Sequence, residues 1–111
     1  CPKCLFTWLI LSPFISRERL TEIFGKDLMS DMALKPIFEE LNGTSAVKPF
    51  ECVGTVEEVR ACADFMADKV ATIAESSPKG DASVAEILQR FNEENFLPEK
   101  FATILKSRLH V

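Results

Sequence analysis

The sequence predicts an all-α fold, and three observations support that prediction. Apolar residues recur mostly at intervals of three and four, as on one face of a helix, and do not alternate as in a strand. Glycine is scarce, with four in 111 residues. Two apolar stretches are preceded by Thr-x-x-Glu or Ser-x-x-Glu, a typical helix start. We expect a single helical domain over residues 1–111, with five to six helices in a compact orthogonal bundle and one extended connector over about 43–54.

Composition sets the limits of this fold. A chain of 111 residues, 47% of them apolar, can bury roughly two-thirds of its surface and form a true core. The net charge of −4 argues against a nucleic-acid partner, which would require a clustered basic face. The most apolar stretch, Leu5 to Leu11, spans only seven residues, one of them Thr7, where a membrane span needs about 20. We therefore expect neither a nucleic-acid nor a membrane partner.

The first two helices have clear boundaries. We place the first over about residues 3–11, with Pro2 in its first turn, where the missing N–H costs nothing. It is apolar nearly all round, so it must be buried centrally or lie against a domain outside this chain. Ser16 is a good N-cap for a second helix over 17–24, which Gly25 closes.

The next stretch combines a helix with an irregular connector. Ser30 or Asp31 caps a third helix that ends near Leu41, and Pro36 inside it predicts either a kink or a restart of the helix. From Gly43 to Gly54 the helical pattern fails. Connectors of this length are more often functional than short turns are.

Three further helices are predicted in the second half of the chain. The Thr55–Glu58 capping box starts the longest, which the apolar stripe carries to about Ala74, with Cys62 on its apolar side. Ser83 and Glu86 repeat the signal for a fifth helix, and Pro98 starts a last one. The residues expected to face inward on the fifth helix are Val84, Ile87, Leu88 and Phe91, and the last helix carries the apolar residues Phe101, Ile104, Leu105 and Leu109.

Cys1 and Cys4 have the spacing of half a tetrahedral thiolate site. Zinc takes four ligands, and a CxxC turn supplies two of them. The other two are not obvious, so the alternatives are a zinc site completed upstream and two reduced thiols. Four cysteines in 111 residues are too few for a disulfide scaffold, which favours a reducing, cytoplasmic setting.

The segment Lys48-Pro-Phe-Glu-Cys-Val-Gly54 is the second candidate site. It places a cation, a carboxylate and a thiol just before the predicted helix start at Thr55. A helix N-terminus favours an anion such as a substrate carboxylate or phosphate. A thiol or carboxylate near it can act as a base for a proton α to a carbonyl. The alternative is a plain connector, with Cys52 buried and with Lys48 and Glu51 solvated.

Both stretches carry a family resemblance. Cys-Pro-Lys-Cys-Leu-Phe-Thr-Trp-Leu at residues 1–9, Ile-Phe-Gly at 23–25, and Lys-Pro-Phe-Glu-Cys-Val-Gly at 48–54 followed by Glu57-Glu58 resemble the C-terminal end of the UDP-N-acetylmuramoyl-L-alanyl-L-glutamate epimerases. These are bacterial enzymes of peptidoglycan precursor synthesis. The resemblance implies an enzyme that inverts the terminal L-Glu of UDP-MurNAc-L-Ala-L-Glu to D-Glu, with ATP and magnesium, through an adenylated carboxylate.

The resemblance also implies roles for individual residues. Lys48 would contact an anion of the substrate, and Glu51 or Cys52 would transfer the proton or orient the substrate. Cys1 and Cys4 would be the last members of a cysteine cluster that holds a structural zinc. ATP and magnesium would bind an upstream domain of the ATP-pyrophosphatase fold.

Two functions from different classes follow. Because the chain starts at Cys1 with no signal-peptide pattern before it, we interpret it as the C-terminal fragment of a longer enzyme, inactive alone. Its partners would be the upstream ATP-binding domain and the UDP-MurNAc-dipeptide. The alternative is a non-enzymatic helical docking domain whose exposed first helix binds a partner.

Overall fold

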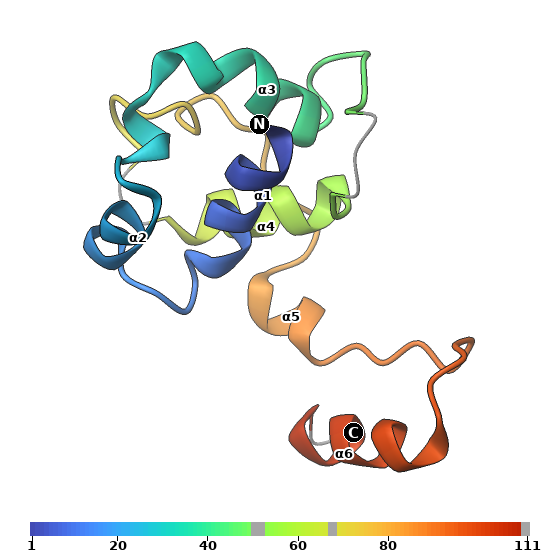
Figure 1. The fold of residues 1–111 in the computed structure, drawn as a ribbon. Coiled ribbons are helices and arrows are strands. Elements are labelled where there is room, and N and C mark those ends of the chain that lie inside the picture. Colours follow the sequence, from blue (N-terminus) through green and yellow to red (C-terminus); the bar gives the residue numbers. More distant parts are fainter. Residues whose placement is uncertain (50–52, 67–68, 110–111) are drawn as a thin grey trace.

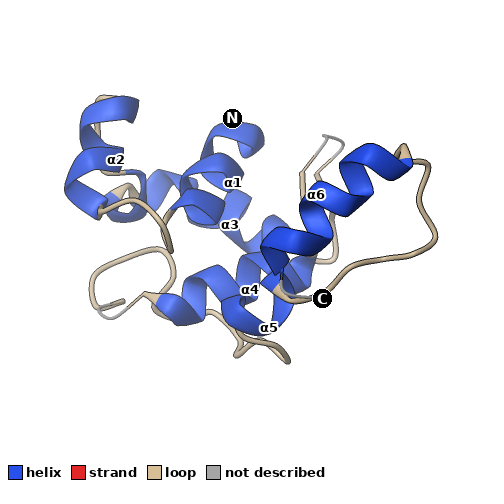
Figure 2. Cartoon of the chain, turned by 90° about the horizontal axis from the view of Figure 1, so that it is seen from below, coloured by secondary structure: helices blue, strands red, loops and turns tan. Residues whose placement is uncertain are grey.

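A computed structural model describes residues 1–49, 53–66 and 69–109 (Figure 1). Within these ranges the chain forms helices and loops only, as Figure 2 shows, and the predicted all-α class is confirmed. The elements in chain order are α1 (Pro2–Leu11), α2 (Arg17–Phe24), the 3₁₀ helices η1 (Leu28–Ser30) and η2 (Met32–Leu34), α3 (Lys35–Leu41), α4 (Val56–Phe65), α5 (Val84–Leu88) and α6 (Glu99–Leu109).

The central helix of the bundle is α1, which packs against both α3 and α4 (Figure 1). Its Leu5, Trp8 and Leu9 are almost fully buried. Of the two predicted alternatives, central burial or packing against a domain outside this chain, the structure shows central burial. The helix is therefore not the exposed docking helix of the alternative function. The core comprises Leu5, Trp8, Leu9, Leu20, Leu28, Met29, Phe38, Leu41, Val59, Ala63, Ile73 and Ala74.

Short polar side chains start the helices of the N-terminal half. The Ser16 hydroxyl accepts a hydrogen bond from the Arg19 N–H at 3.2 Å, and Gly25 closes α2 at φ 78°, as predicted. The expected third helix is split: Asp27 and Asp31 cap two 3₁₀ turns before α3 begins. Pro36 occupies the first turn of α3, so the restart, and not a kink, is what occurs.

The predicted helix from residue 56 to about Ala74 is wrong in its second half. The described helix α4 ends at Phe65, and Met66 has extended backbone angles. Ile73 is buried although it does not belong to α4. Its N–H donates a hydrogen bond to the Met29 carbonyl at 2.9 Å. A tertiary hydrogen bond therefore places Ile73 in the core, where the apolar spacing suggested a continuous helix.

The last two helices are less buried than their apolar residues suggest, although α5 packs on α4 with Val84 and Ile87 half-buried. Neither α5 nor α6 contains a buried residue, and Phe101, Ile104 and Leu105 are each about half exposed. Figure 1 shows α6 set apart from the bundle at the end of the linker 89–98. The radius of gyration is accordingly 15.1 Å, against about 13 Å for a compact chain of this length.

Candidate functional site

The connector between α3 and α4 is anchored at its beginning. Gly43 turns the chain at φ 77°, and buried Asn42 before it accepts the Thr44 N–H on its side-chain oxygen at 2.9 Å. The Asn42 carbonyl in turn accepts a hydrogen bond from Arg60 Nε of α4 at 2.8 Å. Arg60 thus ties the start of the connector to α4. This role of Arg60 could not be predicted from the sequence, because an arginine between apolar helix positions carries no signal for a bond to a distant carbonyl.

The end of the connector is anchored by a close approach of the backbone. A Cβ added at Gly54 would overlap the Phe6 ring of α1 and the Glu58 carboxylate of α4, so this position requires glycine. Val53 beside it packs on the core. The described parts of the connector, 43–49 and 53–54, form no helix or strand, in agreement with the prediction.

The N-terminus of α4 is capped from within. The Thr55 N–H donates to Glu58 Oε2 at 2.7 Å, and the Glu58 N–H donates to Thr55 Oγ1 at 3.2 Å, which confirms the predicted capping box. The Glu58 carboxylate therefore already lies at the positive end of the helix dipole. A substrate anion near this end would depend mainly on a side-chain cation of the connector.

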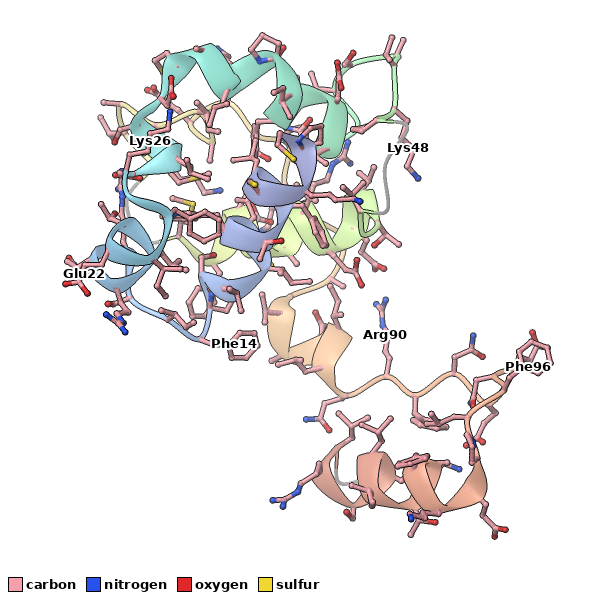
Figure 3. All side chains as sticks on the ribbon, in the orientation of Figure 1. Phe14, Glu22, Lys26, Lys48, Arg90 and Phe96 are labelled. Carbon is pink, nitrogen blue, oxygen red and sulfur yellow. The ribbon has the colours of Figure 1, made fainter. Side chains whose placement is uncertain are left out.

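Lys48 is the one cationic residue in the sequence of the connector 43–54. The side chain is exposed, and Figure 3 shows it extending from the connector beside the bundle. In the described part of the chain it makes no hydrogen bond or ion pair. Phe50, Glu51 and Cys52 lie outside the described residues, so the expected roles of Glu51 and Cys52 stay predictions.

Cys1 and Cys4 lie together at the start of α1. Both are exposed free thiols, and they line a pocket of about 240 Å³ with Phe24, Lys26 and Leu34 among its other walls. As a donor set they fit two of the four positions of a zinc site. Over the described ranges no three His, Cys, Asp or Glu side chains gather as metal ligands.

Cys62 is a buried residue of α4, as its place on the apolar side predicted. Burial, together with the negative charge of Glu58, raises the pKa of the Cys62 thiol to about 11. The residue is therefore a neutral thiol near pH 7 and not a candidate nucleophile.

A comparison with protein families matches residues 1–97 to the MurL C-terminal domain. The chain therefore belongs to this family. Three curated relatives named UDP-N-acetyl-alpha-D-muramoyl-L-alanyl-L-glutamate epimerase match shorter segments. The Salinispora tropica protein is 57% identical over 58 residues, or 52% of this chain. The Micromonospora and Xanthomonas oryzae proteins are 46% and 39% identical over 69 residues, or 62% of this chain.

The matched segments are a small part of these relatives. They cover 13% of the Salinispora tropica protein and 15% of each of the other two. No solved structure matches the chain. The described residues contain no helix long and apolar enough to cross a membrane.

Proposed function

We propose that this chain is the C-terminal domain of an ATP-dependent epimerase that converts the terminal L-Glu of UDP-MurNAc-L-Ala-L-Glu to D-Glu in peptidoglycan precursor synthesis. The family match over residues 1–97 is the observation that carries the proposal, and the names of the three relatives supply the reaction. The three described cysteines are free thiols, which supports a reducing, cytoplasmic setting.

The reaction requires the α-proton of glutamate to be removed and returned on the opposite face. A free carboxylate makes this proton too weakly acidic, and ATP with magnesium, held outside this chain, would activate the carboxylate. The domain would contribute the connector 43–54 as one wall of the glutamate site. Its fixed ends at Asn42 and Gly54 support this, since a positioned wall holds the substrate in a reactive geometry.

Within the connector, Lys48 would hold a carboxylate or phosphate oxygen of the substrate. Glu51 or Cys52 would transfer the proton or orient the α-carbon, because each can serve as a base. Cys1 and Cys4 would provide two thiolates to a structural zinc shared with the upstream domain. The thiols' exposure and their shared pocket support this assignment.

The test uses the full-length protein with ATP, magnesium and UDP-MurNAc-L-Ala-L-Glu. Substrate-dependent release of AMP and pyrophosphate, with D-Glu in the product, is expected. A folded protein that binds ATP but yields neither product would overturn the proposed function. Zinc content is measured in the wild type and in a Cys1→Ser, Cys4→Ser variant, and equal content would refute the half-site.

The residue roles need variants with a matched control. Lys48→Gln is expected to raise KM about 10-fold, since one charge-assisted hydrogen bond is lost. Whichever of Glu51→Gln and Cys52→Ala removes the base should lower kcat about 100-fold or more. Lys79→Gln, on an exposed loop between α4 and α5, is the control and should leave both constants unchanged. Unchanged kinetics in all three connector variants would refute these roles while leaving the epimerase function intact.

A further inference from the structure

An apolar groove opens between the end of α1, α4 and α5. It has a volume of about 150 Å³, and its walls include Ile10, Pro13, Ala61 and Ile87. Two large side chains on its rim, Phe14 and Leu88, are 62% and 43% exposed. A groove with so much exposed apolar surface is typical of a docking site for an apolar helix face.

The same chain also has an exposed apolar helix face, on α6. Phe101, Ile104 and Leu105 are spaced i, i+3, i+4 on α6, and each is about half exposed. No residue of α6 is buried. Since α6 begins at Glu99, it lies beyond residues 1–97, which match the family, so it extends the family domain.

The charges of the two parts are complementary. Helix α6 carries Lys100, Lys106 and Arg108 against Glu99, a net charge of +2. Because the whole chain has a net charge of −4, the rest of it carries −6. Glu58 lines the groove itself. A basic helix is therefore attracted to the acidic domain that carries the groove.

The contacts of the linker hold α6 away from its own groove. Arg90 pairs with Glu57 of α4 at 2.8 Å, which fixes the start of the linker. Lys106 of α6 pairs with Glu93 at 2.7 Å and lies 4.8 Å from the centre of the Phe91 ring. These contacts fold α6 against the linker, beyond α5, as Figures 1 and 3 show.

We propose that the apolar face of α6 docks in the groove between α1, α4 and α5 of a second copy of the chain. Each copy carries one groove and one C-terminal arm, which comprises the linker 89–98 and α6. The exchange is therefore reciprocal and closes with two-fold symmetry. The contact covers the exposed apolar surface of both elements at once. It requires no change in the bundle, because only the linker 89–98 has to redirect the arm.

The experiment is a photo-crosslinking measurement on the full-length protein. A photoreactive phenylalanine analogue replaces Phe101, and this light protein is mixed with unmodified protein uniformly labelled with nitrogen-15. After exchange of subunits and irradiation, mass spectrometry identifies the cross-linked peptides. The expected product joins the light α6 to the heavy peptides that contain Phe14 or Leu88.

Two controls define the contact. Leu88→Glu in the heavy protein places a charge on the groove rim and should reduce the heavy–light product at least 10-fold. The photoreactive residue placed at Thr103, on the opposite face of α6, should give no groove product. Cross-links confined to the light chain, links to another surface, or no cross-links would each overturn the proposal.

Discussion

The bundle and the C-terminal arm have similar patterns of apolar residues, but these residues are buried in the bundle and exposed in the arm. Every described buried residue lies at or before Ala82, whereas residues 83–109 contain none. Both regions form helices with ordinary start signals. The difference is that α1 packs against α3 and α4, while no residue of α6 is buried. An amphipathic pattern thus predicts a helix, but burial depends on what that helix meets.

The largest expected contrast compares two phenylalanines. Phe38 is 1% exposed in the bundle, and Phe38→Ala should lower the free energy of unfolding by about 3–5 kcal/mol, since it removes a ring and leaves a cavity. Phe96 is fully exposed, and Phe96→Ala should not shift the unfolding midpoint measurably. Urea unfolding followed by circular dichroism measures both. Equal losses would mean that the arm packs as the bundle does.

The second contrast concerns two glycines of the bundle. Gly54→Ala should cost about 2–3 kcal/mol, because its methyl group has to displace the Phe6 ring or the Glu58 carboxylate. Gly25 has open space around it, so Gly25→Ala should cost only the backbone strain of φ 78°, about 1 kcal/mol. Gly54→Ala should also raise the KM of the full-length enzyme, and Gly25→Ala should not. The reverse order would show that the connector is not held against α1.

A third test concerns the pH dependence of the bundle. Burial raises the pKa of Asp27, but hydrogen bonds from Arg17 and Ser30 and the charge of Arg17 outweigh it and hold the pKa below 3.8. A lowered folded-state pKa stabilises the protein above the ordinary carboxyl pKa. That stability is lost as the pH falls from about 4 through the folded value.

Asp27→Asn should therefore lower the free energy of unfolding by roughly 1–2 kcal/mol near neutral pH. The difference from the wild type should shrink as the pH falls from about 4 through the lowered folded-state pKa of Asp27, where the wild-type carboxyl becomes protonated in the folded protein. Urea unfolding at a series of pH values measures the difference. A constant difference down to pH 2 would mean that the carboxylate charge contributes nothing there.

The smallest expected effect concerns the junction of the two regions. Arg90→Ala removes the exposed pair with Glu57 and should leave the unfolding midpoint of the bundle unchanged. Amide hydrogen exchange in the linker 89–98 should become faster, because the start of the arm is released. Arg108→Ala, at the far end of α6, is the control. If exchange rises equally in both variants, the Arg90–Glu57 pair does not hold the linker.

Local signals in the sequence predicted local structure well. Ser16 and Gly25 defined both ends of α2, and the two capping boxes placed the starts of α4 and α5. These signals succeed because a cap involves residues three or four apart. Tertiary contacts were not predictable in this way. The Ile73 N–H to Met29 carbonyl bond joins distant segments and overrides the helical spacing of the apolar residues.

The local structure around the candidate residues could be predicted from the sequence, but the contacts that anchor the connector could not. Lys48 and the CxxC pair stand out by residue type, and the structure places them on an irregular connector and at a helix start. The anchoring by Arg60 was not visible, because it involves a main-chain carbonyl 18 positions away. Gly54 marks the end of the non-helical pattern in the sequence, but its close approach to Phe6 is visible only in the structure.

The single tryptophan of the chain, Trp8, lies in the bundle, so its fluorescence distinguishes the bundle from the C-terminal arm. Trp8 is 1% exposed, and its indole N–H has no hydrogen-bond partner among the described residues. An indole in such dry, apolar surroundings emits at short wavelength and shifts to the red when water reaches it. Intrinsic fluorescence therefore reports on the bundle alone, while circular dichroism records α6 as well. A mismatch between the two melting curves would be the spectroscopic signature of an arm that melts by itself.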